Sequence, residues 1–177
     1  MAIGAEATFV ARTHDMDRQH MMAMFRRAHD HRGAALVEIY QNCNVFNDGA
    51  FEAVTGKANR EDMLIPLKHG EPIRFGADGG RGVAMTAEGH LQIVDVAEAG
   101  TEHLLVHDET DQGLAFMLSR LAAGPSEPTP VGVFRAVEEA DHPEYGSAVT
   151  AQIAAAQARS GPGDLRALLH SGATWTV

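Results

Sequence analysis

The sequence predicts an α/β fold, because strand-like and helix-like patterns alternate along its first forty residues. Residues 6–12 (EATFVAR) are rich in the β-branched and aromatic side chains that strands favour. Residues 17–31 carry apolar side chains at helical spacing, and residues 34–40 (AALVEIY) are apolar nearly throughout, as a strand covered by helices on both faces would be. Strand, helix and strand within this length form a βαβ unit, whose two strands should be parallel.

The boundaries of the first helix can also be read from the sequence. Either Thr13 or Asp15 is expected to cap its N-terminus through a side-chain oxygen. Gly33 is expected to end it, because glycine accepts the left-handed conformation that follows many helices. One helical face carries Met21, Met24, Phe25 and Ala28.

The middle of the chain has a different character. A polar loop with a short helix near Phe51 follows the βαβ unit, and residues 61–105 read as short strands broken by glycine and proline. Within them, residues 76–82 (GADGGRG) lie between two strand-like runs and predict a hairpin turn. Residues 103–109 (HLLVHDE) predict a further short strand.

The last third of the chain is expected to be mostly helical. Residues 111–122 predict an amphipathic helix whose apolar face holds Leu114, Met117, Leu118 and Leu121. A proline-rich segment (residues 122–132) runs into a Val-Gly-Val-Phe strand, and an Ala- and Gln-rich helix over residues 146–158 precedes a turn and a last short helix.

We therefore expect one domain made of three stretches. These are a partial α/β unit (residues 1–60), a β-hairpin-rich insertion (61–107), and C-terminal helices with the proline-rich linker (108–177). A lone pair of parallel strands does not make a fold, and its apolar second strand needs neighbours. The chain therefore reads as the later part of an α/β domain that is truncated at its N-terminus.

Composition limits the function. The 177 residues carry a formal net charge of −10, which argues against nucleic acid and against an anionic membrane surface as partners. No apolar run is long enough to cross a bilayer, and the N-terminus lacks the pattern of a secretory signal. A single cysteine, Cys43, cannot form an internal disulfide, so we expect a cytoplasmic protein.

Four histidines near the first helix raise the possibility of a metal site: His14, His20, His29 and His31. Their spacing does not give the i, i+4 pair and third ligand that zinc enzymes use. A solvated helix face is the simpler interpretation.

Two other motifs have simpler interpretations as well. The glycines of residues 76–82 are not followed by a helix, whereas a phosphate cradle requires one. His107, Asp108 and Glu109 are residue types that serve acid–base chemistry or bind a cation, but capping of the next helix by Asp108 or Asp111 explains the acidic residues more simply.

Cys43 has three possible roles when only its neighbours are considered. A nucleophile would need a nearby base, and a metal ligand would need partners, neither of which the segment QNCNV supplies. A small buried thiol is the commonest role for such a residue. The local sequence favours this last role without excluding the others.

Several segments, in order along the whole chain, resemble one enzyme family. They are GAEATFVAR (4–12), ALVEIYQNCNVFNDGAF (35–51), PLKHGEPIRFG (66–76), HLLVHDE (103–109) and PTPVGVFRAVE (128–138). Together they resemble the C-terminal half of the β subunit of 2-oxoacid:ferredoxin oxidoreductases, and in particular of the 2-oxoglutarate enzymes. The resemblance implies the C-terminal part of a thiamine-diphosphate-binding fold, in which helices flank parallel strands, with a short β-hairpin region and a helical tail.

The resemblance also implies cofactors and a role for Cys43. These enzymes decarboxylate a 2-oxoacid on thiamine diphosphate with magnesium, transfer the acyl group to coenzyme A, and pass single electrons through a 4Fe–4S cluster to ferredoxin. Four cysteines hold that cluster, and the last of them lies in a C-x-x-F-N stretch after a strand. Here that stretch is residues 43–47, so Cys43 matches the fourth cluster ligand.

The departures from the family pattern matter equally. The Gly-Asp-Gly stretch of the thiamine site is absent, and so are the other three cysteines. We therefore expect a truncated β subunit that is inactive alone, lacks bound cofactors and self-associates through exposed apolar surface. Its partners in the full enzyme would be an α subunit, ferredoxin, a 2-oxoacid and coenzyme A. The alternative is a non-catalytic partner or scaffold domain that retains only the C-terminal fold.

Overall fold

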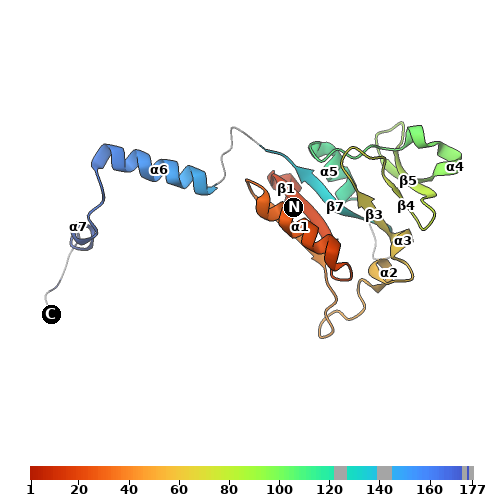
Figure 1. Cartoon of the computed structure of the whole chain (residues 1–177), viewed down its shortest axis with the longest axis horizontal. Coiled ribbons are helices and arrows are strands. Elements are labelled where there is room, and N and C mark those ends of the chain that lie inside the picture. The colour runs from red at the N-terminus through yellow and green to blue at the C-terminus, as the bar shows by residue number, and fades with distance from the viewer. Residues whose placement is uncertain (122–126, 139–144, 173–174, 176–177) are drawn as a thin grey trace. The chain divides into compact units, whose positions relative to one another are not determined.

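The computed structural model describes residues 1–121, 127–138, 145–172 and 175, drawn in Figure 1. The chain divides into two compact units, Met1–Glu139 and Ala140–Val177. The first contains the sheets and every candidate site residue, and the second contains two helices.

The expected βαβ unit is present. Strand β1 (Phe9–His14) leads through helix α1 (Arg18–Asp30) to strand β2 (Ala35–Tyr40). The two strands pair in parallel, from Phe9 opposite Ala35 to His14 opposite Tyr40.

The N-terminal cap of α1 is neither of the two residues expected. Asp17 caps the helix, since its carboxylate accepts a hydrogen bond from the His20 N–H at 2.9 Å. Thr13 is still part of β1, and the Asp15 carboxylate instead accepts from the Asn42 N–H at 3.0 Å. Several acceptors in this segment are suited to capping, and the length of β1 decides which one lies at the helix start.

Two further strands complete a four-stranded sheet of order β2-β1-β7-β3. Strand β7 (Thr129–Ala136), the predicted Val-Gly-Val-Phe strand, lies antiparallel to β1, and β3 (Leu64–Leu67) lies parallel to β7. The sheet is thus mixed, and a strand from late in the chain lies between β1 and β3.

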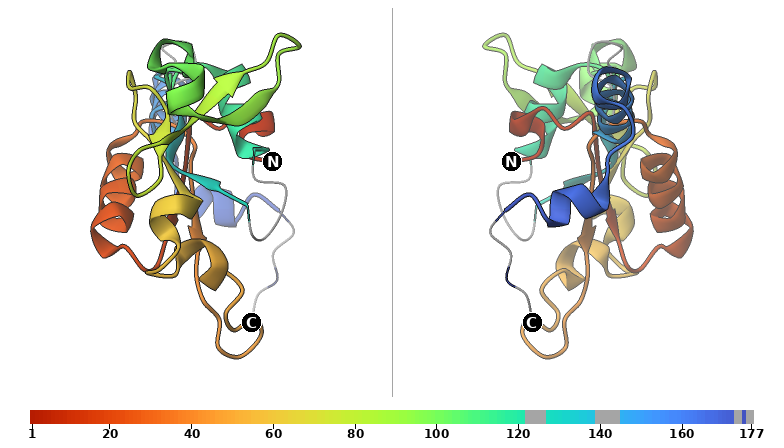
Figure 2. Two further views of the ribbon diagram at one scale, coloured as in Figure 1. Left: turned by 90° about the vertical axis from the view of Figure 1, so that its right-hand side faces the viewer. Right: turned by 90° about the vertical axis from the view of Figure 1, so that its left-hand side faces the viewer.

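Helix α1 covers one face of this sheet, and other elements pack on the opposite face (Figure 2). Each face has its own core. Phe9, Ala11 and Val133 point toward α1 and pack with Met24. Alternate residues of the same strands point to the other face, where helix α5 (Gln112–Ser119), the short turn η1 (Ile3–Ala5) and the hairpin region pack. That larger core contains Ile3, Val10, Ile65, Leu67, Ile73, Phe75, Val83, Leu114, Ala115, Leu118 and Phe134.

Strand β2 does not have the predicted cover on both faces. It lies at the edge of the sheet, where each of its residues is at least partly exposed. Leu36 is 45% exposed and Ile39 is 37% exposed. An apolar strand at an open edge is unusual, because such an edge can pair with another chain.

The hairpin region forms a second, three-stranded sheet. Strands β4 (Arg74–Phe75), β5 (Arg81–Met85) and β6 (Leu91–Asp95) pair antiparallel in sequence order. The glycine-rich segment joins β4 to β5, so the predicted hairpin turn is confirmed. The remaining short elements of the middle region are α2 (Glu52–Thr55), α3 (Arg60–Met63), α4 (Val96–Ala99) and η2 (Thr101–His103).

The strand predicted at residues 103–109 is wrong. The segment makes single bridges to two different partners, Ala84 with Leu104 and Pro72 with Val106. The segment lies between the residues that precede β4 and strand β5, without forming a ladder with either, and its first residue belongs to η2.

The amphipathic helix predicted over residues 111–122 forms over Gln112–Ser119. Gly33 does not end α1, because that helix stops at Asp30 and its C-cap, His31, is extended. Residues 122–126 of the predicted proline-rich segment lie outside the described residues. Asp111 caps α5 by accepting from the Leu114 N–H at 2.9 Å. In the second unit, α6 (Tyr145–Ser160) and α7 (Leu165–Leu169) form as expected, and neither buries a residue. Within the described residues, no helix is both long and apolar enough to cross a membrane.

Candidate functional site

Cys43 lies in a loop that directly follows the C-terminal end of β2. The side chain of Asn42 holds this loop: its Nδ2 donates to Asp48 Oδ1 at 2.9 Å, and its Oδ1 accepts from the Gly49 N–H at 2.8 Å. The Asn47 N–H donates to the Cys43 carbonyl at 2.8 Å. These bonds fold residues 42–49 into a closed turn around Cys43.

The turn gives the Cys43 thiol an unusual environment for an exposed residue. The backbone N–H groups of Phe46 and Val45, and then that of Asn47, lower the pKa of the thiol below its usual value. Hydrogen-bond donors favour the thiolate, which is the form that acts as a nucleophile or a metal ligand. The residue is partly exposed and its sulfur is accessible, so the role of a small buried thiol is wrong.

The same turn presents two apolar side chains to solvent. Val45 is 77% exposed and Phe46 is 91% exposed. The base of the loop is fixed by Tyr40 and Phe51, whose rings stack with centroids 4.5 Å apart. A rigid base and an apolar tip are typical of a loop that packs against another surface.

Cys43 has no set of co-ligands around it. Among the residues that the structure describes, no three His, Cys, Asp or Glu side chains lie close enough to hold a metal ion. Cys43 can therefore supply one thiolate to a metal or cluster, and the remaining ligands would have to come from elsewhere.

The four histidines do not form one site, and they are not all on a solvated helix face. His14 ends β1 and is buried, at 3% exposure. The His20 ring stacks near it, with centroids 6.5 Å apart. His31, beyond the end of α1, hydrogen-bonds the Thr8 hydroxyl at 2.7 Å, and His29 lies exposed in the last turn.

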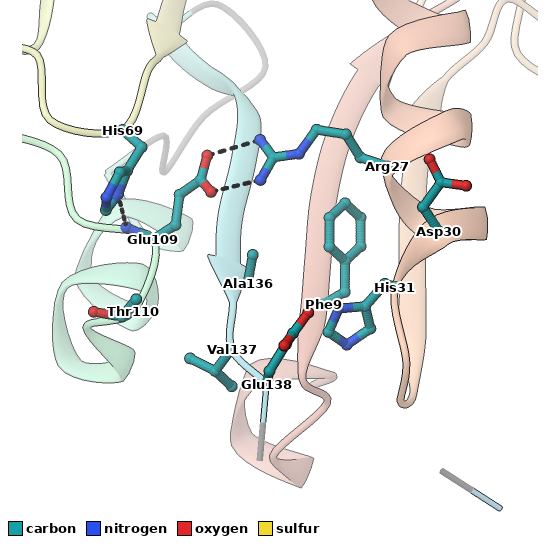
Figure 3. Close-up of a pocket in the computed structure, with 10 residues that line it drawn as sticks. All are labelled: Phe9, Arg27, Asp30, His31, His69, Glu109, Thr110, Ala136, Val137 and Glu138. Atoms are coloured by element: carbon teal, nitrogen blue, oxygen red, sulfur yellow. Dashed lines mark hydrogen bonds and ion pairs between the residues drawn. The ribbon is translucent and has the colours of Figure 1, made fainter. Parts of the chain in front are cut away.

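A polar pocket of about 370 Å³ lies beside α1, at the N-terminal end of β1 (Figure 3). Arg27 and Glu109 face each other across it in a two-pronged ion pair, with N–O distances of 2.9 Å and 2.6 Å. His69 accepts from the Glu109 N–H at 3.1 Å on the far side. Each of the two charges is paired with the other, so the ion pair serves to connect α1 to the segment that precedes α5.

The three acidic and basic residues at 107–109 thus have separate roles. His107 is fully buried and its Nε2 lies 2.7 Å from the Val133 carbonyl. Burial lowers the pKa of His107, more than the Val133 carbonyl and Glu109 raise it, which favours the neutral ring. The Asp108 carboxylate accepts hydrogen bonds from the hydroxyl and the N–H of Thr110. The residue that caps α5 is Asp111.

Arg12 is a residue that sequence reasoning did not single out. Its guanidinium lies between the rings of Tyr40 and Phe134, 5.3 Å and 5.0 Å from their centroids, and its Nε donates to Glu38 at 2.6 Å. It joins β1, β2 and β7 near the base of the Cys43 loop. Nothing in the pattern of a strand identifies such a contact, because the partners come together only in the folded sheet.

Comparison with known proteins gives one sequence relative. The chain is 43% identical, over its full length, to the 2-oxoglutarate oxidoreductase subunit KorB of Mycobacterium tuberculosis. The chain spans about half the length of this curated relative, 47%. No protein-family profile matches it.

Among solved structures, a 2-oxoglutarate:ferredoxin oxidoreductase from Magnetococcus marinus aligns with 94% of this chain and 41% of its own. The sequence identity is 18% and the TM-score is 0.48. That structure holds 2-oxoglutarate, coenzyme A and succinyl-CoA.

Proposed function

We propose that this chain, which is homologous over its full length to a 2-oxoglutarate oxidoreductase subunit, is part of the β subunit of a 2-oxoacid:ferredoxin oxidoreductase. The complete enzyme would oxidatively decarboxylate a 2-oxoacid, form its coenzyme A thioester and reduce ferredoxin. The observation that carries the proposal is the identity of 43% along the whole chain.

Cys43 would be one of the thiolate ligands of a 4Fe–4S cluster. Its solvent-accessible sulfur, and the N–H groups that lower the pKa of its thiol, suit a thiolate ligand. Hydrogen bonds to ligand sulfurs also help set the potential of such clusters. A bound cluster would supply one-electron transfer, and this chain would contribute the rigid loop that orients one ligand.

Thiamine diphosphate and magnesium would be bound by other parts of the enzyme. The 177 residues contain no Gly-Asp-Gly stretch, and the glycine-rich segment GADGGRG is the hairpin turn between β4 and β5. We assign no residue of this chain to either cofactor. On its own, the chain is expected to be inactive.

The proposed partners are an α subunit and ferredoxin, with a 2-oxoacid and coenzyme A as substrates, in the cytoplasm. The exposed apolar residues of β2 and of the Cys43 loop suit burial against another protein surface. In their absence, the same surface would lead the chain to self-associate.

Ferredoxin reduction tests the proposal. The complete subunit, purified with its α subunit under anaerobic conditions, should reduce ferredoxin when given 2-oxoglutarate and coenzyme A together. Cys43→Ala should abolish this reduction while leaving the circular dichroism spectrum unchanged, and Asn44→Ala, an exposed neighbour, should retain it. Full activity of the Cys43→Ala enzyme would rule out the ligand role.

A non-catalytic partner or scaffold domain is the second candidate, favoured by the absence of the other cluster cysteines and of the thiamine motif from this chain. The gene sequence upstream of the first codon separates the two. An in-frame continuation that encodes three further cysteines and a Gly-Asp-Gly stretch supports the enzyme subunit, and a stop codon with a ribosome-binding site supports the scaffold.

A further inference from the structure

A second pocket, of about 360 Å³, lies at the C-terminal end of β1. His14 ends that strand, and it is paired with Tyr40, the last residue of β2. The pocket therefore opens at the same edge of the sheet from which the Cys43 loop departs. Its walls come from the start of α1, from α3, and from the β4–β5 hairpin.

His14 is the buried polar group of this pocket. It lines the cavity at 3% exposure, and its Nδ1 is shielded from solvent with no partner among the described residues. Burial, and then the neighbouring His20, lower the pKa of His14 more than the Asp17 and Asp15 carboxylates raise it, which favours the neutral ring. Because a buried N–H without a partner is more costly than a buried lone pair, the favoured tautomer carries its proton on Nε2 and is a donor there.

Some of the charged groups at the pocket already have hydrogen-bond partners, and others could contact a ligand. Arg74 donates to the Gly79 carbonyl through Nε and Nη2, and the Asp17 carboxylate accepts from the His20 N–H. Within the described part of the chain, neither a hydrogen bond nor an ion pair involves the Arg60 guanidinium, whose charge acts on His14. Glu61 is exposed at the same rim, and the Asp17 carboxylate, although hydrogen-bonded, also keeps its negative charge there.

The helix end at the pocket adds little attraction for an anion. The pocket adjoins the N-terminal turn of α1, where the Asp17 carboxylate already caps the helix and offsets its partial positive charge. The attraction for an anion must therefore come from Arg60. Leu64, Pro66 and Val131 make up an apolar wall on one side of the pocket.

We propose that this pocket binds a small oxyanion, a carboxylate or a phosphate group, between the Arg60 guanidinium and the imidazole of His14. Arg60 supplies the charge, and His14 supplies a neutral donor at the inner wall. The assignment stands on the residues of the pocket and does not depend on the redox activity proposed above.

Calorimetric titration of the 177-residue chain with inorganic phosphate, and separately with succinate, tests the site. Binding of either probe is expected, and the ratio of the two affinities tells which oxyanion the pocket prefers. Arg60→Gln should weaken binding by about tenfold, as expected for loss of one charged hydrogen bond. Glu61→Gln should strengthen it by about twofold, because it removes one opposing charge.

A matched control keeps the test specific. Arg26→Gln removes the same charge from an exposed position on α1 that does not line the pocket, and should change the affinity by less than about twofold. His14→Phe keeps the ring shape and should also weaken binding, with the His20 ring signals in the NMR spectrum reporting whether the fold is kept. Absence of binding at millimolar phosphate and succinate, or equal affinities for Arg60→Gln and the parent chain, would overturn the proposal.

Discussion

At the residue scale, the turn of residues 42–49 makes the Cys43 thiol more acidic than a free cysteine. Its thiolate should therefore form at a lower pH in the folded chain than in the unfolded one. The rate of alkylation by iodoacetamide, followed against pH, should rise with a midpoint below that of the same chain in guanidinium chloride, because only the thiolate reacts. Equal midpoints would show that the N–H groups do not act on the sulfur.

The Arg27–Glu109 pair can be tested at the same scale. Arg27→Met would leave the Glu109 carboxylate, only 9% exposed as a side chain, without its partner. Since Arg27 itself is 45% exposed, the loss of stability should be moderate, about 1–2 kcal/mol. Urea unfolding measures it, and Arg26→Met, the exposed neighbour, should cost less than about 0.5 kcal/mol. Equal effects of the two variants would contradict a specific role for the pair.

The sequence could point to some of these residues and not to others. The role proposed for Cys43 rests on the family resemblance, because its neighbours carry no signature of chemistry. Arg27 and Glu109 are 82 residues apart, and only the fold brings them into contact. His14 was grouped with the helical histidines, whereas β1 extends far enough to bury it.

At the scale of elements, Asn42 is the residue that closes the Cys43 loop. Asn42→Ala should open the loop, speed hydrogen exchange at the Gly49 amide, and raise the pKa of the Cys43 thiol toward its usual value. Asn44→Ala is the matched control, because no hydrogen bond of its side chain occurs within the described residues. An unchanged Gly49 exchange rate in Asn42→Ala would show that the backbone alone holds the loop.

Elements with strong periodicity were predictable, and those that depend on distant partners were not. The helical spacing of residues 17–31 and the β-branched content on either side indicate the βαβ unit from local sequence. Residues 103–109 also carry strand-forming side chains. They nevertheless make only one bridge to each of two different segments and form no strand. Propensity shows that a segment can be extended, and only the tertiary fold decides whether it pairs.

At the scale of the whole molecule, the open edge of β2 and the exposed tip of the Cys43 loop predict association. The chain should sediment as a dimer or larger species at micromolar concentration. Leu36→Lys combined with Phe46→Lys should shift it toward the monomer, since charge at an open edge opposes strand pairing. Met85→Lys, at a position 44% exposed on β5, should leave the distribution unchanged. A monodisperse monomer of the parent chain would contradict the prediction.

The sheet order shows where prediction from sequence ends at this scale. The fold class and the incompleteness of a two-stranded sheet were evident from residues 6–40. The insertion of β7 between β1 and β3 was not, because β7 lies more than a hundred residues after β1 along the chain. Contacts between segments so far apart along the chain leave no pattern in the local sequence.

The central claim is that Cys43 is a cluster ligand in a complete oxidoreductase subunit. Its most direct test is the iron and acid-labile sulfide content of that subunit, together with the electron paramagnetic resonance spectrum after dithionite reduction. We expect equal amounts of iron and sulfide and the signal of a reduced 4Fe–4S cluster in the parent protein, with loss or alteration of both in Cys43→Ala. An unchanged signal and unchanged iron content in Cys43→Ala would contradict the claim.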